Sequence, residues 1–332
     1  MLELTFFVVI VAIAFEISNG WNDSANAIAT VVSTRVLTPV QAVFMASAMN
    51  MLGAIISTTF LSTAVATTIG KGIVDPGAIT EVVVVAALMA GFFWNGAMTV
   101  MGLPVSASHA LIGSLIGAGF AFGGMDVLNL NGLIKIFTAL LLSPVLGIFL
   151  GYLFMKLILK IFGTLPSGTI NRNFGRLQIL SSGFMAFSHG TNDAQKVMGI
   201  ITLALFSGGY LTSMSVPFWV IIICALAMGF GIAMGGWRVI KTLGVSMLKL
   251  EPVHGFAAET SATGIILGAS FMGLPVSTTH VISSCIMGVG ATRRLTAVRW
   301  GIAGKIILAW VFTLPACFIV AYLISKALLG II

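Results

Sequence analysis

The sequence contains the same short motifs twice. Gly-Leu-Pro-Val-Ser occupies residues 102–106 and returns at residues 273–277. An Asn-Asp pair repeats at nearly the same offset, at residues 22–23 and again at 192–193. Because motifs far apart in the chain all repeat at one offset of about 170 positions, the whole chain is expected to be a duplicated unit. In a membrane protein, two such units are typical of a transporter.

The composition places the two units in a lipid bilayer. Apolar residues make up 58% of the chain and charged residues only 8%, whereas about a quarter of residues are charged in soluble proteins. Apolar stretches of about 20 residues, long enough for a helix to cross the bilayer, recur throughout. The formal charge of +7 comes from Lys and Arg between these stretches, which indicates topology rather than nucleic-acid binding. We therefore expect an all-α integral membrane protein.

The apolar stretches predict about five segments in each unit. In the first unit, residues 1–162, they lie near 4–33, 39–69, 80–101, 104–122 and 132–162. In the second unit, residues 174–332, they lie near 174–206, 216–243, 255–273, 275–290 and 298–329. The short polar segment 163–173 is expected to link the units. Pro144 and Pro315 leave open whether each long final segment is one kinked helix or two shorter elements, so the expected total is ten to twelve.

Loop charges indicate that the two units are inserted in opposite directions. The loop after Trp237 is basic, whereas its counterpart at 71–81 holds one Lys against two acids. Because basic loops stay in the cytoplasm, the linker 163–173 is expected there and both termini outside the cell membrane. Five crossings in each unit satisfy this inverted arrangement.

Each Gly-Leu-Pro-Val-Ser motif predicts a helix broken inside the membrane. Proline ends the incoming helix, and the Ser- and Thr-rich run after it suits the start of a new one. Two helix N-termini that meet at the midplane would form an anion site. The alternative is a pair of kinked helices whose hydroxyls bond to their own turns. The candidate anion-binding residues are Ser106, Ala107, Ser108, Ser277, Thr278 and Thr279.

Buried acids predict a cation site beside the anion site. Asp23 and Asp193 lie in apolar surroundings, where an ionised carboxylate costs a few kcal/mol or more unless it is paired. The neighbouring oxygen donors suit Na+, and the candidate ligands are Asn22, Asp23, Thr191, Asn192 and Asp193. The alternative to a bound cation is a salt bridge between Asp193 and Lys196, which lies one helical turn beyond it. Glu259 is expected either to hold a further cation or to bond to a neighbouring hydroxyl. Glu16 is a weaker candidate for the same two roles.

Residues 20–27, residues 188–196 and the two Gly-Leu-Pro-Val-Ser motifs resemble the inorganic phosphate transporter (PiT) family over essentially the whole chain. The resemblance implies uptake of inorganic phosphate driven by Na+ or, in many bacterial members, by H+ with metal–phosphate complexes. It also implies inverted repeats, outward termini and usually a homodimer. Two departures matter: the large cytoplasmic insertion of animal members is missing, and Asn50 stands where members resembling the animal Na+-coupled proteins have an acid. The number of coupling cations known for the family is therefore not carried over to this chain.

We expect a symporter that imports phosphate with Na+ as coupling ion and needs no other cofactor. Asn26 and Gln195 would help to hold phosphate, and Glu259 would be an outlying Na+ ligand. The alternatives are H+-coupled or metal–phosphate symport, sulfate transport and a passive anion channel. An intramembrane hydrolase is not expected, because Ser106 and Ser277 have no GxSxG elbow and a nucleophile needs only one site.

Overall fold

The structure is a computed structural model that describes residues 2–292, 296 and 298–331. Over these residues the chain forms twelve α-helices, short π- and 3-10-helical turns, and no extended strand. The first unit contains α1 (Leu2–Ser33), α2 (Pro39–Ile56), α3 (Ala64–Gly72), α4 (Glu81–Met101), α5 (Ala107–Gly123) and α6 (Leu130–Phe162). The second contains α7 (Ser167–Ser207), α8 (Phe218–Met234), α9 (Trp237–Lys241), α10 (Pro252–Phe271), α11 (Thr278–Ala291) and α12 (Trp300–Ile331).

The helix boundaries refine the expected segments. The second segment of each unit is broken: α2 passes through a π-helical turn into α3, and α8 bends by 64° into α9. The two long final segments are each one helix, with Pro144 inside α6 and Pro315 inside α12. Helix α7 begins at Ser167, directly after Pro166, so most of the expected linker is helical and only residues 163–166 separate the units. Proline is well suited to this place because it lacks the N–H that a helix start leaves unbonded.

The helices at the centre of the molecule are too polar or too short to resemble ordinary membrane spans. Among the described residues, six helices are long and apolar enough to cross a membrane, or seven if the bent α8–α9 pair is one span. Helix α7 is not among them despite its 41 residues, and α11 has only 14. The polar side chains of α7 are tolerated because other helices bury them: Asp193, Gln195 and Lys196 are all at most 2% exposed.

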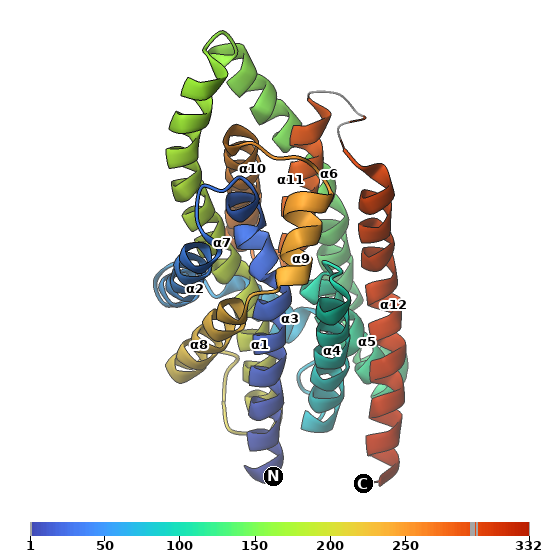
Figure 1. The fold of residues 1–332 in the computed structure, drawn as a ribbon. Helices are drawn as coiled ribbons and strands as arrows, with labels where there is room; N and C mark the ends of the chain where they lie inside the picture. The colour runs from blue at the N-terminus through green and yellow to red at the C-terminus, as the bar shows by residue number, and fades with distance from the viewer. Residues whose placement is uncertain (1, 293–295, 297, 332) are drawn as a thin grey trace.

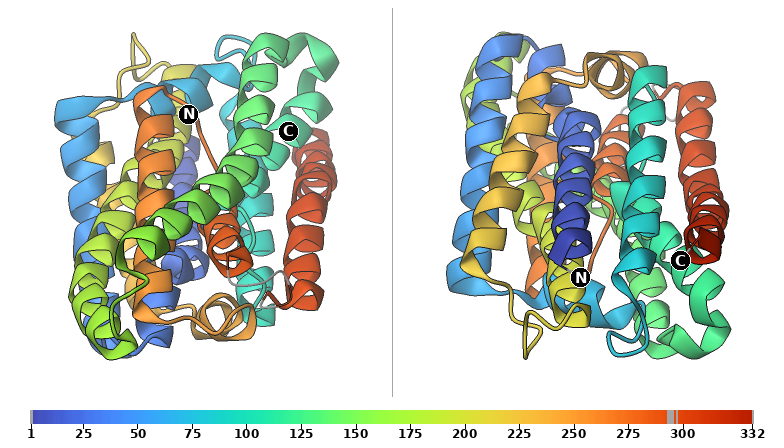
Figure 2. Two further views of the ribbon diagram at one scale, coloured as in Figure 1. Left: turned by 90° about the horizontal axis from the view of Figure 1, so that it is seen from above. Right: turned by 90° about the horizontal axis from the view of Figure 1, so that it is seen from below.

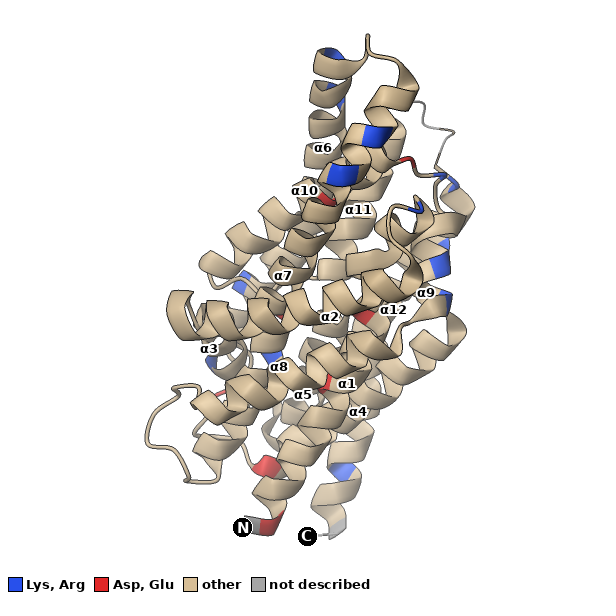
Figure 3. Cartoon of the chain, turned by 60° about the vertical axis from the view of Figure 1, so that its left-hand side comes forward, with Lys and Arg blue, Asp and Glu red and all other residues tan. Residues whose placement is uncertain are grey.

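The first helices of the two units, α1 and α7, run in opposite directions through the bundle. Both chain termini lie at one end of the molecule, and the α6–α7 connection lies at the other (Figure 1). Helix α1 therefore ascends from the end at which its equivalent, α7, finishes. Lys and Arg gather toward the end with the α6–α7 connection (Figure 3). Seen end-on, α1 lies inside the bundle between α8 and α4, whereas α12 lies at the edge (Figure 2).

Helix packing repeats with the units exchanged. Helix α5 packs along α12 as α11 packs along α6, and α1 packs on α8 as α7 packs on α2. Glycines allow these close approaches: a Cβ on Gly113 would lie 2.6 Å from the carbonyl oxygen of Leu314 in α12, and one on Gly151 of α6 would lie 2.6 Å from that of Cys285 in α11. The pairing of elements from both units brings the two repeated motifs to the same place.

Candidate functional site

The two repeated motifs form equivalent breaks between helices. The chain leaves α4 at Gly102 and α10 at Gly273, both in the left-handed region with φ of 73° and 67°, which glycine adopts without steric cost. Ser106 then caps α5 by accepting a hydrogen bond from the His109 N–H at 3.1 Å, and Ser277 caps α11 in the same way. Both serines thus bond to their own helices, the alternative that the sequence left open for these hydroxyls.

The two breaks are in contact with each other. Ser108 Oγ, in the first turn of α5, donates to the Val276 carbonyl at 2.9 Å, and Thr279 Oγ1, in the first turn of α11, lies 3.0 Å from the Val105 carbonyl. Each helix start therefore bonds to the break of the other unit. Two helix N-termini meet at one point inside the protein, where their dipoles favour an anion.

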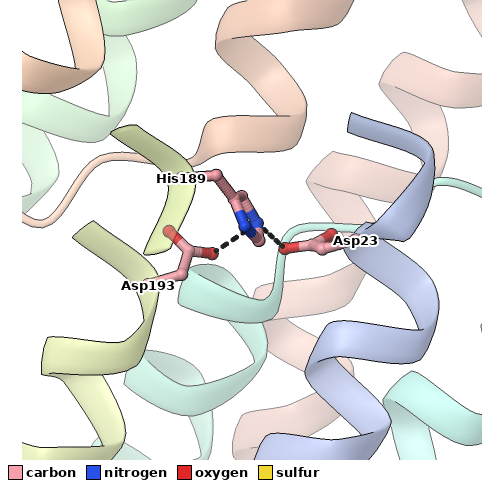
Figure 4. Close-up of side chains that lie close together, drawn as sticks. All are labelled: Asp23, His189 and Asp193. Carbon is pink, nitrogen blue, oxygen red and sulfur yellow. Dashed lines mark hydrogen bonds and ion pairs between the residues drawn. The ribbon is translucent and has the colours of Figure 1, made fainter. Parts of the chain in front are cut away.

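A histidine bridges the two predicted aspartates. His189 Nε2 lies 3.5 Å from Asp23 Oδ2 and 3.6 Å from Asp193 Oδ2 (Figure 4). Its other ring nitrogen, Nδ1, lies 2.6 Å from Asn50 Oδ1, an acceptor, which fixes the ring and places a proton on Nδ1. All three side chains of the bridge are at most 1% exposed, and their ligand atoms lie within 4.8 Å of one another, a spacing compatible with one cation.

Lys196 forms the salt bridge considered for Asp193. Its Nζ lies 2.7 Å from Asp193 Oδ1 and 2.8 Å from the Val276 carbonyl, and it also donates to Ser108 Oγ. All three ammonium protons are thereby used, as a buried charge requires. The positive charge of Lys196 lies against the break of the second unit, directly beside the predicted anion-binding hydroxyls.

The threonines of α11 join the aspartates to the anion-binding residues. Thr279 Oγ1 lies 3.0 Å from Asp23 Oδ1, and Thr278 Oγ1 lies 3.2 Å from Asp193 Oδ2. Asn26 Nδ2 donates to Thr279 Oγ1 at 3.0 Å. One hydrogen-bonded network thus contains both aspartates and both threonines, so that binding at one of them changes the partners of the others.

The two asparagines of the Asn-Asp pairs are held alike. Asn22 Nδ2 donates to Thr99 Oγ1 at 2.8 Å, and Asn192 Nδ2 donates to Ser270 Oγ at the same distance. The carbonyl oxygens of both amides, and that of Asn26, are buried and have no hydrogen-bond donor among the described residues. An oxygen acceptor without a donor at this depth suits a hard cation.

Two predicted site residues, Thr191 and Gln195, bond outside this network. Thr191 Oγ1 donates to the Phe187 carbonyl of its own helix at 3.0 Å. Gln195 Nε2 donates to the Ser62 carbonyl at 2.9 Å, in the break between α2 and α3. Their helical positions turn both side chains toward α2 and α3 rather than toward the aspartates.

Glu259 lies in a polar pocket of its own. It accepts a hydrogen bond from Gln178 Nε2 at 3.2 Å and further bonds from the hydroxyls of Thr30 and Ser181. The sequence left open a bond to a neighbouring Ser or Thr, and the structure shows two such bonds. The carboxylate of Glu259 is therefore hydrogen-bonded by three side chains at a place separate from Asp23 and Asp193.

His189 and Asn50 were missed as site residues. A signal for His189 exists, since it precedes Asp193 by four residues and so lies on the same face of α7. Asn50 has no comparable local signal, because α2 brings it to His189 only through packing of α2 against α7.

Comparisons with known proteins identify the family. The model of the phosphate transporter family matches residues 19–321. The chain belongs to this family. It is similar to a Bacillus subtilis protein described as a probable low-affinity inorganic phosphate transporter, at 47% identity over 95% of this chain and 94% of that protein. A Rhizobium meliloti protein with the same description is 46% identical over 94% and 93% of the two chains.

A solved structure supports the fold. It is described as the sodium-dependent phosphate transporter, and it matches 99% of this chain and 100% of its own with a TM-score of 0.90 at 24% identity. Membership of the family makes this protein a multi-pass membrane phosphate transporter and not an enzyme. The predicted all-α membrane fold is confirmed by the helical structure and by this match.

Proposed function

We propose that this transporter imports inorganic phosphate together with Na+ by alternating access. The observation that carries the proposal is the buried pair Asp23 and Asp193, which lies against two converging helix N-termini. An anion at those N-termini is repelled by the carboxylates unless cations bind with it, so each ligand raises the affinity of the other. The similar solved structure is that of a protein described as sodium-dependent, in agreement with this choice of cation.

The ligand positions follow from the free acceptors. Na+ would bind to Asp23 with Asn22 Oδ1 in the first unit, and to Asp193 with Asn192 Oδ1 in the second, because these amide oxygens have no other donor among the described residues. Phosphate would bind between the first turns of α5 and α11. Its residues there would be Ser108, Thr278 and Thr279, with the backbone N–H of Ala107, and Lys196 would supply a positive charge.

The same proposal includes the topology. The termini would lie outside the cell and the α6–α7 connection in the cytoplasm, which makes the two units inverted repeats. Support comes from the opposite course of α1 and α7 and from the basic residues at the α6–α7 end (Figures 1 and 3). The homodimer implied by the family resemblance stays a prediction, which light scattering of the purified protein would test.

A proton is the second candidate for the coupling ion, because His189 lies between both carboxylates. A proton on Nε2 would neutralise the pair much as Na+ would. Metal–phosphate complexes as substrate belong to this same alternative, since the resemblance implies them for many bacterial members.

One experiment separates these possibilities. Purified protein in liposomes is given labelled phosphate while the Na+ and pH gradients are imposed separately. We expect uphill accumulation with an inward Na+ gradient alone and its collapse when that gradient is removed. Accumulation that follows only the pH gradient would replace Na+ by H+, and uptake that never exceeds equilibrium would indicate a channel. Excess sulfate is expected not to compete, because protonated phosphate can donate to Asp23 or Asp193 and sulfate at neutral pH cannot.

A further inference from the structure

A continuous polar stripe runs along α1 on both sides of the central site. Glu16, Asn19, Asp23, Asn26 and Thr30 follow one another at spacings of three and four residues and are all at most 2% exposed. This spacing places them on one face of the helix. Asp23 lies at the middle of the stripe, and Glu16 lies two turns, about 10 Å, from it toward the N-terminal end.

Glu16 is a buried carboxylate without a cationic partner. It is fully buried, and the ion pairs found among the described residues, all formed by His189 or Lys196, do not include it. Its Oε2 accepts one bond from Asn19 Nδ2 at 3.3 Å, and its Oε1 has no partner. The second unit has alanine, Ala186, at the equivalent place. A carboxylate in this position is expensive to ionise unless a cation joins it.

Further buried polar atoms without partners lie at the same level of the bundle. Asn19 Oδ1 and both amide atoms of Asn95 are buried and have no hydrogen-bond partner among the residues that the structure describes. Unbonded buried polar atoms are rare, so three in neighbouring turns of α1 and α4, beside the unpartnered Glu16 Oε1, point to a binding site.

The register of α1 and α4 places Asn95 against this part of α1. Gly91 of α4 meets the Phe15 ring of α1, and Thr99 of α4 accepts from Asn22 of α1. Asn95 lies midway between Gly91 and Thr99, one turn from each, and so on the same face of α4. Its level along α1 is that of Ser18, midway between Phe15 and Asn22.

We infer that Glu16, Asn19 and Asn95 form a second binding site for a small monovalent cation, separate from the central pair of aspartates. The donor set is one carboxylate and two amide carbonyls, the oxygen ligands that a hard cation takes. The site lies between Asp23 and the end of the molecule that holds both termini (Figure 1). A cation held there would lie about 10 Å, two helical turns, from Asp23 along the polar face of α1. The choice of Na+ as the cation rests on the proposed function; the existence of the site does not.

The test is direct binding of radioactive Na+ to purified protein in detergent without phosphate. Glu16→Gln keeps the size of the side chain and removes its charge, and we expect it to bind one Na+ per chain fewer than the wild type at saturation. Glu81→Gln is the matched control, because Glu81 is also a buried acid of the α1–α4 pair but accepts from Thr5. We expect the control to bind as many Na+ ions as the wild type.

Two further variants keep the test decisive if Glu16→Gln does not fold. Asn95→Ala leaves the carboxylate in place and removes a ligand from the other helix, and Glu16→Asp retracts the carboxylate. Both are expected to raise the Na+ concentration for half-saturation of this site about tenfold, the effect of losing one bond to a charged group. Unchanged Na+ number and half-saturation in a folded Glu16→Gln, or in both of these variants, would overturn the inference. Because phosphate is absent, this outcome is independent of whether uptake in liposomes follows Na+ or H+.

Discussion

Lys196 holds in the second unit the place that Asn26 holds in the first. Asn26 donates to Thr279 on α11, and Lys196 donates to its equivalent, Ser108, on α5. These two acceptors also make equivalent contacts, because the Thr279 hydroxyl lies against the Val105 carbonyl and the Ser108 hydroxyl against that of Val276. One symmetric arrangement therefore carries a neutral amide on one side and a positive charge on the other. As a result, Asp193 has a permanent partner, whereas Asp23 depends on His189 or on a bound cation.

Removing Asp193 is expected to destabilise the protein strongly. Asp193→Asn leaves the ammonium of Lys196 buried without its counter-charge, which costs about 3–5 kcal/mol. The measurement is thermal unfolding of the purified variant in detergent. The double variant Asp193→Asn/Lys196→Met removes both charges and should recover most of the lost stability. A double variant no more stable than the single one would show that the pair does not hold the fold at this point.

Removing Asp23 is expected to affect Na+ rather than the fold. In Asp23→Asn the amide oxygen still accepts from Thr279, and no lysine is left unpaired, so the melting temperature should stay close to that of the wild type. Uptake in liposomes should need a much higher Na+ concentration for half-maximal rate. Asp75→Asn, at an exposed loop acid, is the control and should leave both quantities unchanged. Wild-type Na+ dependence in Asp23→Asn would remove Asp23 from the cation site.

Ser106 and Ser108 are expected to behave differently although both belong to the same predicted site. Ser106 caps α5, so Ser106→Ala should lower stability by about 1 kcal/mol. Ser108 bonds to Lys196 and to the opposite break, so Ser108→Ala should chiefly raise the phosphate concentration for half-maximal uptake. Melting curves and uptake at varied phosphate distinguish the two effects. The reverse pattern would mean that Ser106, not Ser108, faces the anion.

The GxxxG motif at Gly113–Gly117 of α5 and the one at Gly264–Gly268 of α10 are expected to differ in packing. A Cβ on Gly117 would overlap the backbone of Phe318 in α12, so Gly117→Ala should cost about 1–3 kcal/mol by forcing α5 and α12 apart. Gly268 on α10 has open space around it, so Gly268→Ala should be neutral or slightly stabilising. The comparison requires only melting temperatures of the two variants. Equal losses would mean that another surface, such as a second copy of the chain, covers Gly268.

The helix breaks were predictable because their signals are local. Proline, a glycine with positive φ and a capping serine act within one or two turns, and the motif at 102–106 contains them all. Duplication then required a second break at 273–277. The apolar stretch near 174–206 predicted the position of α7, but this helix is not apolar enough to count as an ordinary membrane span, because other helices bury its polar side chains.

The sequence by itself determined a duplicated membrane bundle, two broken helices and the acids nearest to them. Only the tertiary structure decided that His189 joins Asp23 to Asp193, that Lys196 is paired, and that Gln195 and Glu259 bond elsewhere. The physical reason is distance along the chain. A helix face follows from the spacing of neighbouring residues, but a bond such as that of His189 to Asn50 depends on the register and tilt of two packed helices, and no local pattern specifies these.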